Sequence, residues 1–312
     1  MVNVDSTDEQ PKLLAIVGPT AIGKTALSLT IARRFDGEVI SADSRLFYRH
    51  MDIGTAKPLA DERGDIPHHF IDIVNPDQTV TLGDYQDQCF ATIGAIDARN
   101  RLSILVGGTG QYAWAVLEGW GIPRVPPQPA LRAELEERST DDLHNELEER
   151  DPVAAAKIHP NNKRRIVRAL EVCIVANRPI SELQAKTPPP YDMLIVGLTT
   201  DRTTLYQRID DRVDRMMDAG FLDEMRALKE MGFGRKLPSM SGLGYAQLWE
   251  YLDGERSLPE AIERIKNETH RFVRHQNNWF KPTDPRIRWF DIADPDYPKN
   301  AERQIEAWLT GE

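Results

Sequence analysis

The sequence has few of the features that define several large classes of proteins. It contains only two cysteines, Cys89 and Cys173, and neither forms a CxxC pair or lies near clustered histidines, so we expect no disulfide framework and no zinc site. No apolar run approaches the roughly 20 residues that cross a bilayer. The first residues, MVNVDSTDEQPK, are polar and acidic, whereas a secretory signal would be basic and then apolar. We therefore expect a cytoplasmic protein with no membrane partner.

Composition and charge narrow the possibilities further. With 312 residues, of which 40% are hydrophobic and 28% charged, the chain is typical of a globular protein with two domains or one large domain. A net charge of −10 argues against a generally basic surface for nucleic acid. Two segments are nevertheless basic: 159–186 has six bases and two acids, and 264–281 has five bases and one acid. Such patches can bind phosphates, although charge runs alone more often form solvent-exposed helix faces.

Apolar segments that alternate with helical patterns indicate an α/β fold. Residues 13–17 form an uninterrupted apolar run, and 38–41 and 102–106 have the same character, which is typical of buried parallel strands. A helical pattern follows the first strand, with Gly37 as its expected C-cap glycine, and 82–98 is predicted to be a helix. This order predicts a doubly wound parallel sheet with functional groups at the carboxyl ends of its strands.

Two proline-rich segments divide the chain. IPRVPPQP at 122–129 and PPP at 188–190 cannot lie inside a strand or helix. The residues between them are helical in composition, and a strand pattern resumes at 193–198. We expect residues 1–121 and 191–312 to form the α/β core with C-terminal helices, and residues 122–190 to form an inserted, smaller, all-helical domain. Further helices are predicted at 205–219 and from Ser257, which has capping-box spacing with Glu260.

The segment GPTAIGKT fits the GxxxxGK[ST] pattern and lies between a predicted buried strand and the start of a helix. Its residues are Gly18, Pro19, Thr20, Ala21, Ile22, Gly23, Lys24 and Thr25. In such loops, successive backbone N–H groups, the helix N-terminus and the lysine bind phosphate oxygens, and the hydroxyl of Thr25 can hold Mg²⁺. The motif predicts a phosphate, diphosphate or nucleotide site in a P-loop NTPase-like fold.

The loop does not reveal whether phosphate is transferred or leaves with its substrate. A kinase or ATPase usually has an acid at the end of a neighbouring strand to support the metal, but the strand at 102–106 ends in Gly107 and Gly108. Asp43, in ISADSRLFY, follows the second strand and could accept a proton. On spacing alone Asp43 could equally be an Asx-turn or cap residue.

Taken together, these segments resemble bacterial tRNA dimethylallyltransferases, also called tRNA isopentenyltransferases. The similar blocks are GPTAIGKT (18–25), ISADSRLFYRHMDIGTAKP (40–58), PHHFID (67–72), LVGGTGQY (105–112), DPVAAAKIHPNNKRRIVRALEV (151–172), RIDDRVDRMMDAG (208–220), GY (244–245) and HQNNWFK (275–281). Their order and spacing agree with the family over nearly the whole chain. The resemblance implies transfer of a dimethylallyl group from dimethylallyl diphosphate to N6 of adenosine 37 in tRNAs that read codons beginning with U. A P-loop with Mg²⁺ suits this reaction because a departing diphosphate needs positive charge and N–H donors.

The resemblance also implies roles for individual residues. It makes Asp43 the general base or N6 anchor, Thr20 and Arg212 diphosphate contacts, and Lys24 and Thr25 ligands of phosphate and Mg²⁺. The residues that it assigns to the tRNA anticodon stem-loop are Asp43, Ser44, Arg45, Leu46, Thr109, Arg132, Arg164, Arg165, Ile166, Val167, Arg168, Arg274, His275 and Gln276. It also implies that the protein acts as a monomer. No role follows for the segment DIGTAKP at 52–58.

The last block departs from the family pattern. Where relatives commonly have Lys-Arg-Gln, then Thr, Trp and a final Arg, this chain has Arg274, His275 and Gln276, then Asn278, Trp279 and Lys281. The change removes guanidinium groups that could bind phosphates with two hydrogen bonds each.

Three other functions stay open at this stage. An adenylate dimethylallyltransferase, which makes free cytokinin nucleotides, has similar P-loop and aspartate motifs, but the inserted helical domain and the basic segments favour tRNA. A P-loop kinase of a small metabolite is the second alternative. The third is a noncatalytic RNA-binding protein with a vestigial loop, which the intact loop and Asp43 oppose.

Overall fold

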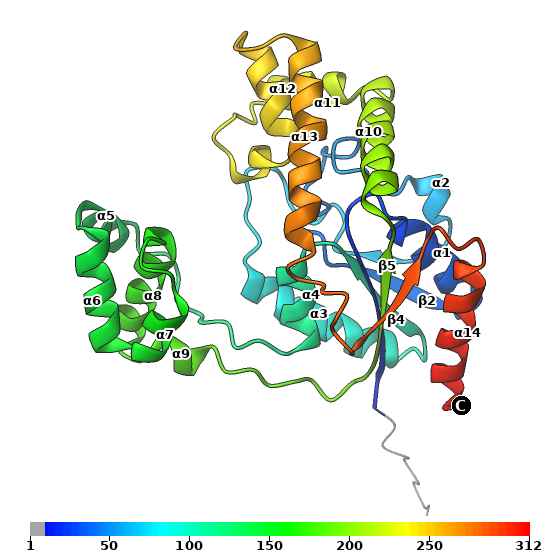
Figure 1. Ribbon diagram of the computed structural model, residues 1–312, viewed down its shortest axis with the longest axis horizontal. Helices are drawn as coiled ribbons and strands as arrows, with labels where there is room; N and C mark the ends of the chain where they lie inside the picture. The colour runs from blue at the N-terminus through cyan, green and yellow to red at the C-terminus, as the bar shows by residue number, and fades with distance from the viewer. Residues whose placement is uncertain (1–9) are drawn as a thin grey trace, which may run out of the picture. The chain divides into compact units, whose positions relative to one another are not determined.

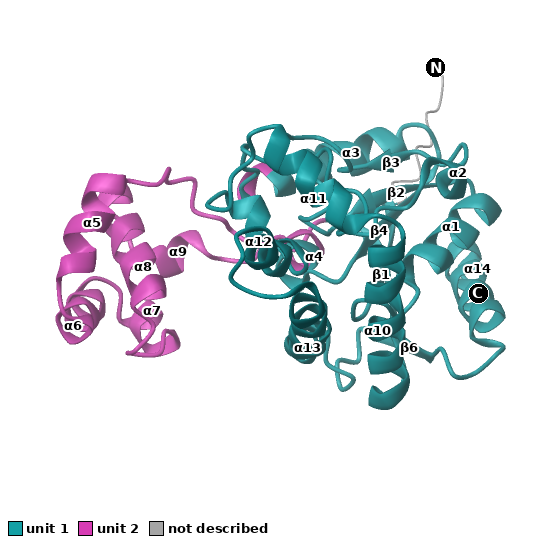
Figure 2. Cartoon of the chain, turned by 90° about the horizontal axis from the view of Figure 1, so that it is seen from above, with its two compact units in different colours: residues 1–81, 85–113, 190–312 teal, residues 82–84, 114–189 magenta. Residues whose placement is uncertain are grey.

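The computed structural model describes residues 10–312, which form two compact units. Unit 1 comprises residues 10–81, 85–113 and 190–312, and unit 2 comprises residues 82–84 and 114–189 (Figure 2). Unit 2 is therefore inserted in the sequence of unit 1. No helix within residues 10–312 combines the length and the apolar character needed to cross a membrane.

Unit 1 is built on a parallel β-sheet (Figure 1). Its strands are β1 (Lys12–Val17), β2 (Gly37–Ser41), β3 (His68–His69), β4 (Leu102–Gly107), β5 (Asp192–Thr199) and β6 (Ile287–Asp291). They lie in the order β3-β2-β4-β1-β5-β6, and every neighbouring pair is parallel. The predicted doubly wound sheet is confirmed, and the carboxyl ends of β1, β2 and β4 share one edge. β3 and β6 have no counterpart in the sequence-based expectation.

The following helices lie wholly or partly in unit 1, with residues 82–84 and 114–117 belonging to unit 2. They are α1 (Lys24–Arg34), α2 (Ala60–Arg63), α3 (Leu82–Asp97), α4 (Gly110–Leu117), α10 (Arg202–Asp218), α11 (Phe221–Glu230), the 3₁₀ helix η1 (Pro238–Ser241), α12 (Tyr245–Leu252), α13 (Leu258–Gln276) and α14 (Tyr297–Thr310). Leu14 and Ile16 of β1 pack in one cluster with Ile31 of α1, Ile209 of α10 and Ile305 of α14. This cluster fixes the helices that flank the loop between β1 and α1.

Gly37 does not have the predicted role. Helix α1 ends at Arg34, and Asp36, with φ of 47°, takes the left-handed conformation instead. Gly37 is the first residue of β2, where a Cβ would lie 2.6 Å from Cδ1 of Ile104. The glycine is needed for close strand packing rather than for the end of the helix.

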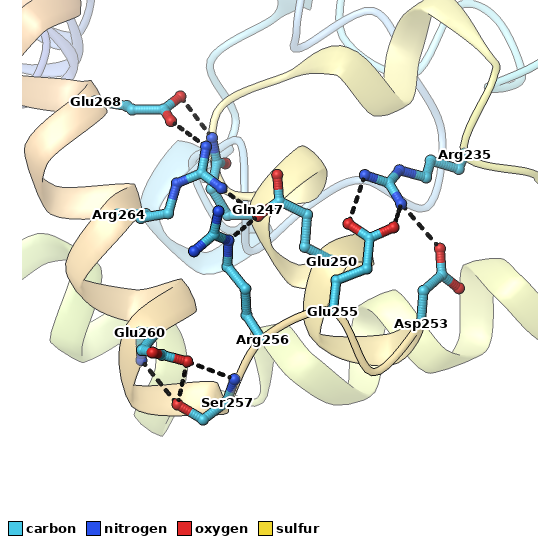
Figure 3. Close-up of polar contacts among 10 residues, drawn as sticks. All are labelled: Arg235, Gln247, Glu250, Asp253, Glu255, Arg256, Ser257, Glu260, Arg264 and Glu268. Carbon is cyan, nitrogen blue, oxygen red and sulfur yellow. Dashed lines mark hydrogen bonds and ion pairs between the residues drawn. The ribbon is translucent and has the colours of Figure 1, made fainter.

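The predicted start of α13 is confirmed. The backbone N–H of Ser257 donates to Oε2 of Glu260 at 2.9 Å, and the Ser257 hydroxyl accepts from the N–H of Glu260 at 3.5 Å (Figure 3). Farther along, Arg264 pairs with Glu250 of α12 and, at 2.8 Å, with Glu268 of its own helix. These polar contacts fix α13 against α12 and so direct its C-terminal half.

Unit 2 consists of α5 (Pro129–Glu137), α6 (Thr140–Arg150), α7 (Pro152–Lys157), α8 (Lys163–Ala176) and α9 (Ile180–Leu183). It has its own core, in which Leu143, Leu147, Ile166 and Leu170 are fully buried. Helix α8 contributes most to this core, because its residues 166, 167 and 169–173 are all buried.

Candidate functional site

The P-loop has the backbone path that its glycines predict. Gly18 and Gly23 adopt φ values of +142° and +107°, and a Cβ on Gly18 would lie 2.7 Å from the carbonyl oxygen of Leu198. Ile22 is 1% exposed and anchors the loop in the core of unit 1. Because both glycines take conformations that other residues avoid, the loop is held in an open curve at the N-terminus of α1.

Lys24 folds over this loop. Its Nζ donates hydrogen bonds to the carbonyl oxygens of Gly18 at 3.0 Å and Pro19 at 2.8 Å. Burial lowers the pKa of Lys24 to about 8, Asp43 opposes that shift, and Arg212 adds to it. The site therefore contains positive charge that an anionic ligand would stabilise.

Asp43 lies two residues beyond the end of β2. Its Oδ1 accepts the backbone N–H of Arg45 at 3.0 Å, and its own N–H donates to Oγ of Ser41 at 3.2 Å. The local turn predicted as the alternative role is thus present. It uses one carboxylate oxygen, so within residues 10–312 Oδ2 keeps its capacity to accept a proton.

Arg212 reaches the site from α10. Its Nη2 donates to the carbonyl oxygen of Thr55 at 3.4 Å. Burial lowers the pKa of Arg212, although Asp43 raises it and Arg215 lowers it further. Sequence spacing alone gave no reason to place this arginine beside the P-loop, since α10 follows the inserted unit.

Two cavities in unit 1 meet at Arg212. The larger, of about 750 Å³, is lined by cationic and P-loop residues that include Lys24, Thr25, Arg208, Arg212 and Arg215. The smaller, of about 360 Å³, is lined by Thr20, Asp43, Thr109 and Arg212 together with the apolar side chains of Ile209, Val213, Phe221 and Phe272. A polyanion suits the first cavity, and an apolar group beside an acid suits the second.

Gln276 joins the P-loop to the end of β4. Its Oε1 accepts the backbone N–H of Thr20 at 2.9 Å, and its Nε2 donates to the carbonyl oxygen of Gly108 at 2.9 Å. The residue is 4% exposed, so its amide is committed to these two loops. The resemblance had assigned Gln276 to tRNA, and its polar contacts here are all within unit 1.

The other residues of unit 1 that the resemblance assigned to tRNA divide into two groups. Ser44, Arg45 and Thr109 line the smaller cavity with Asp43, and Leu46, half-buried, donates its N–H to the carbonyl oxygen of Asp43. Arg274 and His275 are exposed on α13, where Arg274 donates to the Tyr206 hydroxyl at 3.3 Å. The first group is therefore part of the site, and the second lies on an exposed helix face.

Within unit 2, the assigned residues of α8 differ in exposure. Arg164 and Arg165 are exposed, whereas Ile166 and Val167 lie in the core of unit 2, at 0% and 4% exposure. Within residues 10–312, neither exposed arginine has a side-chain hydrogen bond or ion pair. This pair is the available cationic surface of the block.

Arg132 and Arg168 instead bind the carboxylate of Glu171, which is 0% exposed. Arg132 makes two hydrogen bonds of 2.8 Å, Arg168 one of 2.5 Å, and the N–H of Gln128 one of 2.6 Å. Burial raises the pKa of Glu171, but the hydrogen bonds from Arg132, Gln128 and Arg168 outweigh it and bring the pKa to about 2. These two arginines thus stabilise the unit internally.

Thr25 fits the expected Mg²⁺ ligand. It is exposed in the first turn of α1, lines the larger cavity, and its hydroxyl has no protein partner among the described residues. A hydroxyl oxygen beside a phosphate site is the type of ligand that Mg²⁺ accepts.

Comparison with known proteins agrees with this geometry. The profile of the family described as IPP transferase matches residues 46–283. A tRNA dimethylallyltransferase of Roseiflexus castenholzii is 53% identical over 93% of this chain and 96% of its own, and one of Chloroflexus aggregans is 50% identical over 92% and 97%. The crystal structure of a tRNA isopentenylpyrophosphate transferase from Bacillus halodurans superposes with a TM-score of 0.73 at 40% identity, covering 97% of this chain and 98% of that one. A eukaryotic dimethylallyltransferase acting on tRNA gives a TM-score of 0.84 at 29% identity, covering 96% and 80%.

Proposed function

The chain belongs to the IPP transferase family, and from this membership we infer that it is a transferase that moves the dimethylallyl group of dimethylallyl diphosphate to N6 of adenosine 37 in tRNAs reading codons that begin with U. The structural observation that best supports this inference is the position of Arg212, which borders both the cationic cavity of the P-loop and the apolar cavity that contains Asp43. Such an arrangement suits an allylic diphosphate, whose charged and apolar ends need different surroundings.

We propose that the diphosphate occupies the larger cavity. Its negative charge would be stabilised by Lys24, Arg212 and the backbone N–H groups at the start of α1. Thr25 would hold Mg²⁺, which supplies further charge stabilisation to the leaving group when bound. The lowered pKa values of Lys24 and Arg212 support this placement, because a bound anion offsets the cost of burying both cations.

The acceptor would enter the smaller cavity. As N6 of the adenine attacks C1 of the dimethylallyl group, the C1–O bond breaks and its electron pair leaves with the diphosphate. The new amine must lose one proton, and Asp43 accepts it through the oxygen that the turn leaves unused. No phosphoryl group is transferred, which distinguishes this reaction from that of a kinase.

Unit 2 favours tRNA over adenylate as the acceptor, because its exposed Arg164 and Arg165 can bind phosphates of an anticodon stem-loop that free AMP lacks. We propose that the protein performs this reaction in the cytoplasm, as a monomer. Static light scattering should give the mass of one chain, 35.4 kDa.

The acceptor is tested with labelled dimethylallyl diphosphate. In separate reactions, tRNA, AMP, or ATP with candidate metabolites is supplied, and label should enter tRNA alone. Label in AMP would establish the adenylate reaction instead. Phosphate transfer from ATP would establish a kinase.

The role of Asp43 is tested by Asp43→Ala. Loss of a proton acceptor should lower kcat about 100-fold or more, while tRNA affinity changes far less. Asp77→Ala is a matched control, because Asp77 is exposed and its side chain makes no hydrogen bond or ion pair within the described residues. Near-normal turnover of Asp43→Ala would remove Asp43 from the reaction.

A further inference from the structure

The segment DIGTAKP, residues 52–58, forms a tightly held loop beside the site. At its carboxyl end, Lys57 is almost fully buried, and its Nζ donates to Oδ1 of Asp52 at 2.6 Å, to Oδ1 of Asp72 at 2.5 Å and to the carbonyl oxygen of Tyr48 at 2.5 Å. All three protons of the ammonium group are used. The loop is therefore held at one end by Lys57, a residue that also lines the larger cavity but whose ammonium protons are all donated to these three acceptors.

Glu224 of α11 fastens the other end. Its Oε2 accepts the backbone N–H of Asp52 at 2.8 Å and of Ile53 at 2.6 Å, and its Oε1 accepts the N–H of Gly54 at 3.2 Å and the hydroxyl of Tyr245 at 2.6 Å. Three successive N–H groups thus converge on one carboxylate, an arrangement that normally binds a free anion. Within residues 10–312 Glu224 has no cationic partner, so these dipoles and the hydroxyl stabilise its charge.

Packing reinforces this contact at Gly54. A Cβ on Gly54 would lie 2.2 Å from Cε2 of Phe221 and 2.7 Å from Cε2 of Tyr245. Both rings are 1% exposed, and they meet edge to face with centroids 5.0 Å apart. Only glycine allows the loop to approach α11 and α12 this closely.

Thr55, the residue after Gly54, connects this loop to the site. The carbonyl oxygen of Thr55 accepts Nη2 of Arg212, the residue that borders both cavities. We propose that Glu224 is a positioning residue: it holds residues 52–55 so that the Thr55 carbonyl orients the guanidinium of Arg212 toward the departing diphosphate. This inference rests on the proposed function, since it assumes that Arg212 stabilises the leaving group. Tight orientation matters because a preorganised donor does not have to reorganise during the reaction.

A double-mutant cycle tests this connection. Glu224→Gln keeps the size of the side chain but places an amide N–H₂ among N–H donors, so the loop contact weakens. We expect kcat to fall about tenfold, with the KM for tRNA within about twofold of wild type. In an Arg212→Ala background the same change should have almost no further effect, because the residue through which Glu224 acts is gone. A merely structural contact would reduce activity by the same factor in both backgrounds.

Two further variants sharpen the test. Tyr245→Phe removes one of the four donors to Glu224 and should lower kcat by about two- to fivefold in the wild-type background only. If circular dichroism shows that Glu224→Gln fails to fold, the double-mutant cycle with Arg212→Ala is measured with Tyr245→Phe instead. Asp223→Asn is the matched control, since Asp223 is the exposed neighbour of Glu224 and, among residues 10–312, forms its ion pair with Arg226 alone, at 2.7 Å. Its kcat should equal that of wild type.

Equal losses in both backgrounds, or an unchanged kcat in Glu224→Gln and Tyr245→Phe, would overturn the positioning role. Failure of the proposed function is a separate outcome. If the wild-type enzyme labelled AMP rather than tRNA, the acceptor would be wrong, and the same cycle would still be measured with AMP.

Discussion

Lys24 and Arg212 bring more positive charge into the site than Asp43 balances, and burial lowers the pKa of both. Each cation would be more stable in water, so the site is poised to bind an anion. Lys24 at present donates to the carbonyl oxygens of Gly18 and Pro19, contacts that a diphosphate oxygen can replace. The two buried cations, Lys24 and Arg212, therefore favour a ligand with more than one negative charge.

The pKa of Lys24 predicts a pH dependence. A pKa of about 8, below the ordinary lysine value, means that Lys24 is charged below pH 8 and loses its charge above it. We expect kcat/KM for dimethylallyl diphosphate to fall as pH rises through about 8, because this parameter reports groups of the free enzyme. Lys24→Arg, whose guanidinium stays protonated, should lose this limb of the profile in its residual activity. An identical limb in that variant would assign the titration to another group.

Gln276 and His275 are adjacent but face different surroundings, which predicts opposite kinetic effects. Gln276→Ala leaves the Thr20 N–H and the Gly108 carbonyl without their partner, at a cost of about 1–3 kcal/mol. It should lower kcat/KM for dimethylallyl diphosphate about tenfold or more and change tRNA affinity little. His275→Ala, at an exposed position, should weaken tRNA binding instead. The two patterns are separated by steady-state kinetics and filter binding, and matching effects would contradict the assignment.

At the scale of elements, the sequence was most informative where a pattern is local. The glycine spacing, the apolar strands and the capping box at Ser257 each depend on a few neighbouring residues, and the structure confirms all three. β6 was missed because it is a short edge strand with exposed residues and no continuous apolar run. Gly37 was misassigned because a glycine after a helix has the same sequence signature whether it ends the helix or begins a strand.

The candidate site was only partly predictable for the same reason. The P-loop and Asp43 follow strands directly, so strand order places them together. Arg212, Gln276 and Glu224 reach the site from α10, α13 and α11, and only the packing of these helices brings them there. A buried glutamine or a glutamate bound to backbone N–H groups has no local sequence signal.

Helix α8 contains Glu171, a buried carboxylate whose lowered pKa makes the stability of unit 2 depend on pH. Glu171 has a pKa of about 2 in the folded protein against an ordinary 4.5. A lowered carboxyl pKa contributes stability above pH 4.5, and that contribution disappears as pH falls from 4.5 toward 2. Its size is on the order of 3 kcal/mol.

Glu171→Gln should therefore unfold at a lower temperature than wild type at pH 7, with the difference in Tm shrinking as pH falls below about 4.5. Thermal unfolding followed by circular dichroism across this range measures it. Glu182→Gln, which alters an exposed pair with Arg178, should show little difference at any pH. A Tm difference for Glu171→Gln that is constant with pH would show that its ionisation does not stabilise unit 2.

For the molecule as a whole, a net charge of −10 has to be reconciled with binding a polyanion. Among the described residues, five of the eleven cations of segments 159–186 and 264–281 form ion pairs with acids: Arg168, Arg178, Lys186, Arg264 and Lys266. Paired cations contribute little to long-range attraction. Binding of tRNA should then depend on a few unpaired side chains, while the overall negative charge repels other nucleic acid.

Among the described residues of unit 2, Arg164 and Arg165 are the exposed, unpaired arginines on which tRNA binding should depend most. Each phosphate that a protein cation neutralises releases counterions, so changing both residues to alanine should weaken tRNA binding and flatten its salt dependence by up to about two units of slope. The binding of dimethylallyl diphosphate should not change, because its cavity is built from unit 1 residues. Arg150→Ala with Arg178→Ala changes the net charge equally, but both arginines are exposed and already paired with glutamates, so the slope should stay near that of wild type. If filter binding gave the same slope for all three proteins, Arg164 and Arg165 would be an ordinary solvent-exposed helix face, and the RNA contacts would have to come from unit 1 alone.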